Sequence, residues 1–126
     1  MCILFAEDEQ FFHMMVVEGL QEAGLEVAEA ATGDQALELI QTSGHQFTAL
    51  VTDFHMPGAD GSKVAAAMRK AWPLIPIIIA TGSPDCFKPQ WNDKLGYYLL
   101  VKPYTPRQLV DLVHTMIGRN KPGPCV

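Results

Sequence analysis

The sequence predicts an α/β fold in which helices cover both faces of a parallel sheet. Short apolar segments alternate with amphipathic segments five times along the chain, as expected when strands and helices follow one another. Three short segments, residues 2–6, 49–52 and 77–80, are continuous apolar runs, which are typical of strands covered on both faces. The alternation and the continuous runs together favour a parallel sheet.

Two further strands complete the expected sheet. Residues 25–30 alternate, with Leu25 and Val27 on one side and Glu26 on the other, which is typical of an edge strand with one wet face. Residues 98–101 form a short fifth apolar run. We therefore expect five strands, the second of them at an edge.

Helices are expected between the strands. Phe12, Val16 and Leu20 repeat at helical spacing, and Val64 and Met68 do so after Gly61. Two more helices begin with capping boxes, in which a threonine cap is followed three residues later by a glutamine. These boxes are residues 32–35 and 105–108.

The fourth inter-strand segment, residues 83–96, does not fit the pattern. Pro89 stands where a second helical turn would form, and proline there removes a hydrogen bond and clashes with the preceding turn. We expect a short, displaced or mobile helix. The chain end contains Pro122, Gly123 and Pro124, so we expect residues 1–119 to form one domain and residues 120–126 a tail or linker.

Composition excludes several classes of function. The 126 residues suffice for one domain, and a net charge of −5 argues against direct binding of nucleic acid. No apolar run reaches the roughly 18 residues of a membrane helix, and no signal-peptide pattern opens the chain. Three widely spaced cysteines form neither a metal motif nor a disulfide framework. We expect a cytoplasmic protein that acts away from membranes.

Polar residues follow four of the five expected strands. Glu7 and Asp8 follow the first, Asp53 the third, Thr81 the fourth and Lys102 the fifth. Because ligands of parallel α/β sheets bind at the carboxyl ends of the strands, these side chains converge on one crevice if the strands are neighbours.

The residue types in this crevice indicate phosphoryl chemistry. Three clustered carboxylates repel one another unless a cation is present, and an oxygen-only ligand set suits Mg²⁺. The hydroxyl of Thr81 and the ammonium of Lys102 are useless to a bare cation, but they would hold a phosphoryl group beside it. Asp53 is then the natural nucleophile, and its attack on phosphorus would give an aspartyl phosphate.

The same residues resemble the receiver domain of two-component response regulators. The resemblance covers nearly the whole chain, in order and with similar spacing. It rests on Glu7-Asp8, the run from Asp53 to Gly61, Thr81-Gly82 and Lys102-Pro103-Tyr104. It implies a flavodoxin-like (βα)5 fold, doubly wound, with strand order 2-1-3-4-5.

The resemblance also implies roles for single residues. Asp53 would accept the phosphoryl group, Thr81 would move onto it, and Lys102 would pair with it. The bond between Lys102 and Pro103 is typically cis in the family. The implied donor is a histidine kinase or a histidine phosphotransfer protein, and the implied recipient of the signal is a downstream effector protein or domain.

Metal binding is implied in the same way. Asp8 and Asp53 would bind Mg²⁺ directly, Glu7 would act largely through water, and the backbone carbonyl of His55 would complete the set. Glu7 replaces the commoner aspartate but keeps a carboxylate. We place the side chain of His55 at the rim of the site and hypothesise that it controls access of water. We expect Glu9 to stabilise the start of the following helix by its charge, close to the positive end of the helix dipole.

Three alternatives remain open beside this interpretation. A degenerate receiver would act as an interaction module without phosphorylation, although every chemical position is filled. A phosphatase with an aspartate nucleophile would need a second acid at position 55, where this chain has histidine. A flavin carrier would have its phosphate repelled by Glu7 and Asp8. The position of a frequent aromatic switch is Leu99, so an aromatic rotation is not expected there.

Overall fold

The structure is a computed structural model that describes residues 2–42, 47–82 and 97–120, with side chains described up to Ile117. It contains five strands and, in the described ranges, four helices. In chain order these are β1 (Cys2–Ala6), α1 (Gln10–Glu22), β2 (Glu26–Ala30), α2 (Gly33–Thr42), β3 (Ala49–Asp53), α3 (Gly61–Ala71), β4 (Ile77–Thr81), β5 (Tyr97–Val101) and α4 (Pro106–Asn120).

The five strands form one parallel sheet in the order β2-β1-β3-β4-β5. This is the flavodoxin-like order implied above, and the expected edge position of the second strand is confirmed. In the register, Ala6 lies beside Thr52 on β3, and Asp53 lies beside Ala80 on β4. The ends of β1, β3 and β4 therefore lie side by side at one edge of the sheet.

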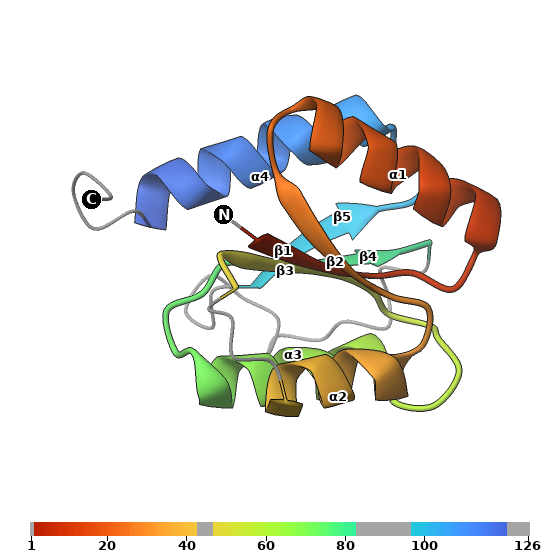
Figure 1. Cartoon of the computed structure of the whole chain (residues 1–126), viewed down its shortest axis with the longest axis vertical. Helices are drawn as coiled ribbons and strands as arrows, with labels where there is room; N and C mark the ends of the chain where they lie inside the picture. Colours follow the sequence, from red (N-terminus) through yellow and green to blue (C-terminus); the bar gives the residue numbers. More distant parts are fainter. Residues whose placement is uncertain (1, 43–46, 83–96, 121–126) are drawn as a thin grey trace.

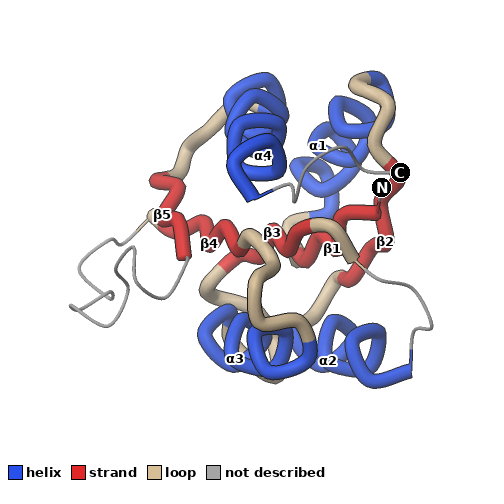
Figure 2. The backbone as a smooth tube through the Cα atoms, turned by 90° about the vertical axis from the view of Figure 1, so that its left-hand side faces the viewer, coloured by secondary structure: helices blue, strands red, loops and turns tan. Residues whose placement is uncertain are grey.

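Helices cover both faces of the sheet. Figures 1 and 2 show α1 and α4 on one face and α2 and α3 on the other. Each face has its own apolar core: Phe5, Leu20 and Leu109 belong to one, and Leu4, Leu50 and Met68 to the other. Strands β3 and β4 are buried along their whole length, which accounts for their continuous apolar sequences.

The helix starts follow the local sequence signals. In both predicted capping boxes the glutamine N–H donates to the threonine hydroxyl, at 3.0 Å for Gln35 and Thr32 and 3.1 Å for Gln108 and Thr105. The side-chain oxygen of Gln108 accepts the Thr105 N–H in return, at 2.8 Å, whereas that of Gln35 accepts the N–H of the preceding residue, Ala31, at 2.7 Å. The side chain of Glu9 caps α1, which places its charge at the helix start as expected.

Two features expected from the sequence lie outside the residues that the structure describes. The helix expected in residues 83–96 lies outside the described residues, and so does residue 121 onward of the expected tail. Within the described ranges, none of the helices has the length and apolar character needed to cross a bilayer.

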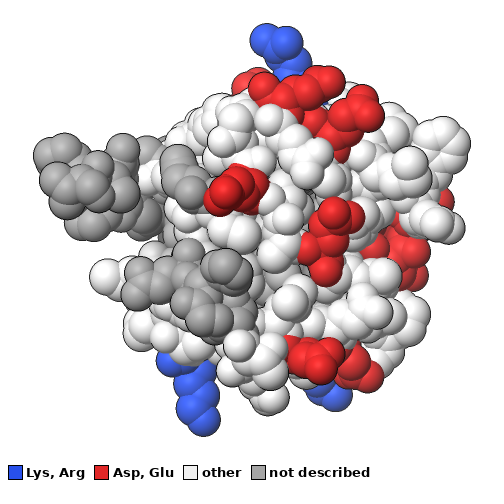
Figure 3. Space-filling model, viewed as in Figure 1, with Lys and Arg blue, Asp and Glu red and all other residues white. Residues whose placement is uncertain are grey.

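On the face in Figure 3, acidic side chains are spread widely, whereas the basic ones drawn there lie at the top and bottom margins.

Candidate functional site

The candidate site lies at the carboxyl ends of the central strands. Glu7 and Asp8 follow β1, Asp53 ends β3 and Thr81 ends β4. Because β1, β3 and β4 are parallel neighbours, these four residues are brought to the same edge of the sheet. The convergence expected from the sequence is therefore present.

Three carboxylates form the centre of the site. Ligand atoms of Glu7, Asp8 and Asp53 all lie within 4.8 Å of one another. Glu7 is only 1% exposed and Asp53 is 7% exposed, whereas Asp8 is exposed to solvent. The cluster thus has a buried side against the sheet and an open side at Asp8.

Lys102 closes the buried side of the cluster. Its Nζ donates to Asp53 Oδ2 at 2.9 Å and to Glu7 Oε1 at 3.1 Å, so one ammonium joins two buried carboxylates. Its backbone N–H donates to the carbonyl of Thr81 at 2.8 Å, and the following Lys102–Pro103 bond is cis. The ring of Phe12 lies 5.7 Å from Nζ, at a distance that allows a cation–π contact.

Burial and the neighbouring charges shift the pKa values of Asp53, Glu7 and Lys102. Burial, partly offset by Lys102, raises the pKa of Asp53, and the nearby Asp8 raises it further. Burial also raises the pKa of Glu7, against a hydrogen bond from the Glu9 N–H. Burial alone would lower the pKa of Lys102, but its bonds to Asp53 and Glu7 outweigh that effect and raise it. Two buried carboxylates therefore share one ammonium, and the site favours additional positive charge.

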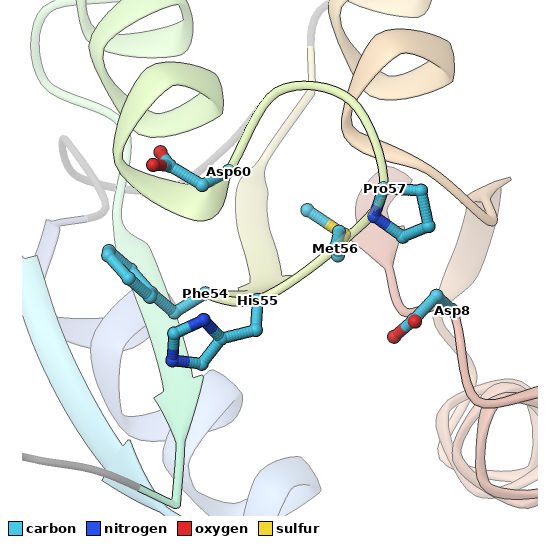
Figure 4. Close-up of a pocket in the computed structure, with 6 residues that line it drawn as sticks. All are labelled: Asp8, Phe54, His55, Met56, Pro57 and Asp60. Carbon is cyan, nitrogen blue, oxygen red and sulfur yellow. The ribbon is translucent and has the colours of Figure 1, made fainter.

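Thr81 ends the strand next to that of Asp53, and His55 lies in the loop that follows Asp53. Thr81 is fully buried and follows Ala80, the residue beside Asp53 in the sheet. His55 is exposed and lines a hollow of about 520 Å³ next to Asp8. Figure 4 shows Asp8 on the chain after β1, and His55 on the loop that follows β3. This is the rim position expected for the His55 side chain.

The donor set fits a hard divalent cation. All three clustered side chains offer carboxylate oxygens, the ligands that Mg²⁺ prefers, and no soft ligand belongs to the cluster found among the described residues. The exposed side of Asp8 leaves room for the water molecules that Mg²⁺ usually retains. Burial raises the pKa values of Asp53 and Glu7, and an added cation would offset this cost of holding both groups ionised.

Two neighbours of the site were not assigned to it from the sequence. His13 in α1 is buried, and its Nδ1 lies 2.9 Å from the Glu7 carbonyl oxygen while Nε2 lies 2.9 Å from Glu29 Oε1. Tyr104 is buried against Phe12, with ring centroids 4.9 Å apart. The six-residue spacing between Glu7 and His13 gives no ligand signal, because the contact depends on the angle at which α1 leaves the sheet.

Comparison with known proteins agrees with this geometry. A family model described as the response regulator receiver domain matches residues 3–114. The receiver protein CpdR of Brucella abortus is 30% identical over 116 residues, which cover 91% of this chain and 95% of CpdR. The chain belongs to the response regulator receiver domain family, and it is a receiver domain of the two-component type.

Two further relatives show how such a domain is used elsewhere. The sensor kinase CckA of Brucella abortus is 34% identical over 119 residues, which cover 94% of this chain but only 13% of the kinase. The crystal structure of the chemotaxis response regulator CheY4 of Vibrio cholerae has a TM-score of 0.77 and 30% identity, covering 91% of this chain and 97% of CheY4. The chain thus matches a small part of one relative and nearly all of others.

Proposed function

We propose that this receiver domain is a phosphorylation switch in which Asp53 accepts a phosphoryl group from a phosphohistidine donor. The observation that carries the proposal is the ion pair between Lys102 Nζ and Asp53 Oδ2, at 2.9 Å, inside a cluster of three carboxylates. An isolated acidic cluster could bind a cation alone. The ammonium adds a fixed positive charge on the nucleophile, where an incoming anion would need it.

The transfer step is a substitution at phosphorus. An oxygen of the Asp53 carboxylate forms the new P–O bond, and the P–N bond to the donor imidazole breaks. The electron pair of the broken bond stays on the imidazole nitrogen, and the ring leaves neutral when its other nitrogen carries a proton. Lys102 would exchange part of its contact with the carboxylate for the phosphoryl oxygens, whose charge grows near its Nζ.

Mg²⁺ is the proposed cofactor, held by Asp8, Asp53 and the backbone carbonyl of His55, with Glu7 acting largely through water. When bound, it would neutralise charge on the transferring phosphoryl oxygens. The chain itself supplies the buried wall of Glu7 and Asp53 and the open wall of Asp8. The oxygen-only cluster and its raised pKa values support this choice.

Thr81 is the proposed reporter of phosphorylation. Its hydroxyl is buried at the end of β4, and its carbonyl accepts the Lys102 N–H. A hydroxyl that moves onto the phosphoryl group would pull on this buried connection between β4 and the end of β5. The phosphoryl group can shift the balance between the inactive and the active state only if its contacts differ between those two states.

We further propose that the domain is not an enzyme with an outside substrate and that it works in the cytoplasm. Its chemistry would be phosphorylation of its own Asp53 and loss of the group to water. The proposed donor is a histidine kinase or phosphotransfer protein, and the proposed recipient is an effector protein or domain. Phe11 and Met14, 71% and 64% exposed on the helix after Asp8, offer apolar surface to a protein donor.

The alternative is a receiver that signals without phosphate. It is disfavoured because Glu7, Asp8, Asp53 and Lys102 all contribute to one cluster, which an interaction module would not need. Intact-mass measurement after incubation with acetyl phosphate separates the two functions. The proposal expects the mass of one added phosphoryl group on the wild type with Mg²⁺, and none when EDTA replaces Mg²⁺.

Two variants complete that experiment. Asp53→Asn should gain no phosphoryl mass, whereas Asp111→Asn, an exposed acid on α4, should behave like the wild type. Wild type that stays unmodified with Mg²⁺, both with acetyl phosphate and with a panel of phosphorylated donor proteins, would refute the switch and favour the interaction module. Phosphorylation that persists in Asp53→Asn would refute Asp53 as the acceptor.

A further inference from the structure

The loop between β3 and α3 carries one side of the metal site and is fastened to α2. The loop spans residues 54–60, and its residues 54–57 and 60, which include His55, line the hollow beside Asp8 (Figure 4). The loop begins with the Phe54 N–H donating to the Ala80 carbonyl at 2.9 Å, and it ends with the Gly61 N–H donating to the Phe54 carbonyl at 2.7 Å. These bonds fix its two ends but not its middle.

The middle of the loop is held by the first turn of α2. The Gly33 N–H donates to the Pro57 carbonyl at 3.2 Å, and the buried Ala59 N–H donates to Asp34 Oδ1 at 3.1 Å. A buried backbone N–H requires an acceptor, and the Asp34 carboxylate is the acceptor for the Ala59 N–H. The two bonds therefore join the start of α2 to the 54–60 loop, and their partners are 24 and 25 residues apart in the chain.

The approach of the two segments is too close for larger residues. A Cβ on Gly33 would overlap the Ala59 carbonyl, and a Cβ on Gly58 would lie 2.6 Å from Cγ of Asp34. Gly58 also has φ of +77°, which side chains rarely adopt. The loop and α2 are thus in direct contact over residues 33–34 and 57–59.

Asp34 is not needed to begin α2. The Gln35 backbone N–H already donates to the Thr32 hydroxyl at 3.0 Å, and the Gln35 side chain accepts the Ala31 N–H at 2.7 Å, so this helix start is capped without Asp34. The carboxylate of Asp34 is therefore free to reach out of its own helix. Its contact with Ala59 has its main effect on the loop beside the metal site.

We propose that Asp34 is a positioning residue for Mg²⁺, acting through the Ala59 N–H to hold the 54–60 loop at the distance from Asp8 that the cation requires. This inference rests on the proposed use of Mg²⁺ at the site. Asp34 is not among the proposed ligands of the cation or of the phosphoryl group. Groups that orient metal ligands from outside typically change metal affinity by about tenfold or more when removed.

The test is a calorimetric titration of Mg²⁺ into four variants of the whole chain. Asp34→Ala removes the acceptor and should weaken Mg²⁺ binding by about tenfold. Asp34→Asn keeps an oxygen acceptor and should bind Mg²⁺ nearly as tightly as the wild type. Gly58→Ala strains the same contact and should resemble Asp34→Ala.

Gly24→Ala is the matched control. Gly24 has φ of +87° at the end of α1, and a Cβ there would meet nothing within 4 Å. It should therefore cost stability, as Gly58→Ala does, and leave Mg²⁺ affinity unchanged. Urea unfolding in EDTA checks that each variant is folded, and Asp34→Asn and Gly58→Ala keep the test decisive if Asp34→Ala does not fold.

Nuclear magnetic resonance adds a local readout. In the wild type, Mg²⁺ should shift the amide signals of His55 and Ala59 together, and in Asp34→Ala the Ala59 signal should no longer follow. Equal Mg²⁺ affinity of the wild type, Asp34→Ala and Gly58→Ala would overturn the inference, as would equal losses in Asp34→Ala and Asp34→Asn. Absence of Mg²⁺ binding by the wild type would instead refute the proposed cofactor.

Discussion

The carboxylate of Asp53 is buried and has therefore lost most of its contact with water. Burial raises its pKa, Lys102 opposes this, and Asp8 adds to it, so the net environment disfavours the ionised form. The folded-state pKa is therefore above the unfolded-state value. The stabilising contribution of a protonated Asp53 is present at low pH and is lost as the pH rises through the folded-state pKa.

This sign predicts the effect of a neutral replacement. In EDTA at pH 7, Asp53→Asn should have a higher free energy of unfolding than the wild type, because it removes an ionised carboxylate from a site that disfavours it. The difference should shrink as the pH falls through the folded-state pKa of Asp53, because the wild-type carboxyl then gains its proton. Urea denaturation at several pH values measures both.

The exposed Asp111 provides the comparison for this experiment. Asp111→Asn on α4 should leave the free energy of unfolding close to that of the wild type across the same pH range. If Asp53→Asn is less stable than the wild type at pH 7, the ion pair with Lys102 stabilises the domain more than burial of the charge destabilises it.

His55 has a different expected role, since its side chain lies on the open side. It lines the hollow next to Asp8, and we propose that water reaches an acyl phosphate on Asp53 through this hollow. We predict that His55→Ala shortens the half-life of the phosphorylated domain by opening this path. Loss of the phosphoryl mass with time measures it, and His114→Ala, an exposed histidine on α4, is the control. Equal half-lives for all three proteins would dismiss the hypothesis.

The main site residues could be predicted because each one directly follows or ends a strand. Asp53, Thr81 and Lys102 need only the rule that parallel strands bring their carboxyl ends together. Glu9 was separable from Glu7 and Asp8 because it stands at the start of a helix. His13 and Asp34 were not predicted as neighbours of the site, since their contacts depend on how two elements pack and leave no local signal.

At the scale of single elements, helix starts were the most predictable feature. The box at residues 105–108 has both hydrogen bonds that its pattern predicts. In the box at residues 32–35 the Gln35 N–H donates to Thr32 as predicted, but the Gln35 side chain accepts the N–H of Ala31 in place of that of Thr32. The start of α3 is different, because in the sequence Asp60 is part of the motif after Asp53 and is not marked as a cap. Its side chain accepts the Lys63 N–H at 3.1 Å and caps that helix.

Asp60→Ala should therefore destabilise the domain by about 1 kcal/mol at pH 7. Burial would raise the pKa of Asp60, but hydrogen bonds from Ser62 and from the Lys63 N–H outweigh it and lower the pKa. A lowered pKa contributes stability above the unfolded value of an aspartate and loses it as the pH falls through the folded-state value. The cost of the substitution should thus decrease in acid.

Thermal or urea unfolding at pH 7 and at about pH 3 measures this change. Asp60→Asn retains a side-chain acceptor and should lose less stability than Asp60→Ala at pH 7. A cost of Asp60→Ala that stays constant with pH would show that the ionised carboxylate is not the stabilising species at this cap.

For the whole molecule, the order of the strands was the step that the residues alone did not give. Alternating strands and helices predict a parallel sheet, and the edge pattern of residues 25–30 places one strand. The full order 2-1-3-4-5 came from the resemblance, because several orders satisfy the same local patterns. The contact between α2 and the 54–60 loop follows only once that order is known.

The proposed metal links the site to the stability of the whole domain. A ligand that binds only the folded state adds about 2.7 kcal/mol when its concentration is a hundred times its dissociation constant. We predict this gain for the wild type when Mg²⁺ replaces EDTA at constant ionic strength. Asp8→Asn, which removes the exposed carboxylate of the cluster, should lose most of it. An equal gain in both proteins would show that Mg²⁺ acts elsewhere.

The outer position of β2 has a consequence for how copies of this domain meet. An edge strand offers unpaired N–H and C=O groups to any other strand, and this is a common route to aggregation. The open edge here carries Glu26 and Glu29, both exposed. A second copy adding its own β2 would bring carboxylates against carboxylates. We therefore expect the exposed carboxylates of this edge to disfavour the pairing of two copies through β2 and, with it, the growth of fibres.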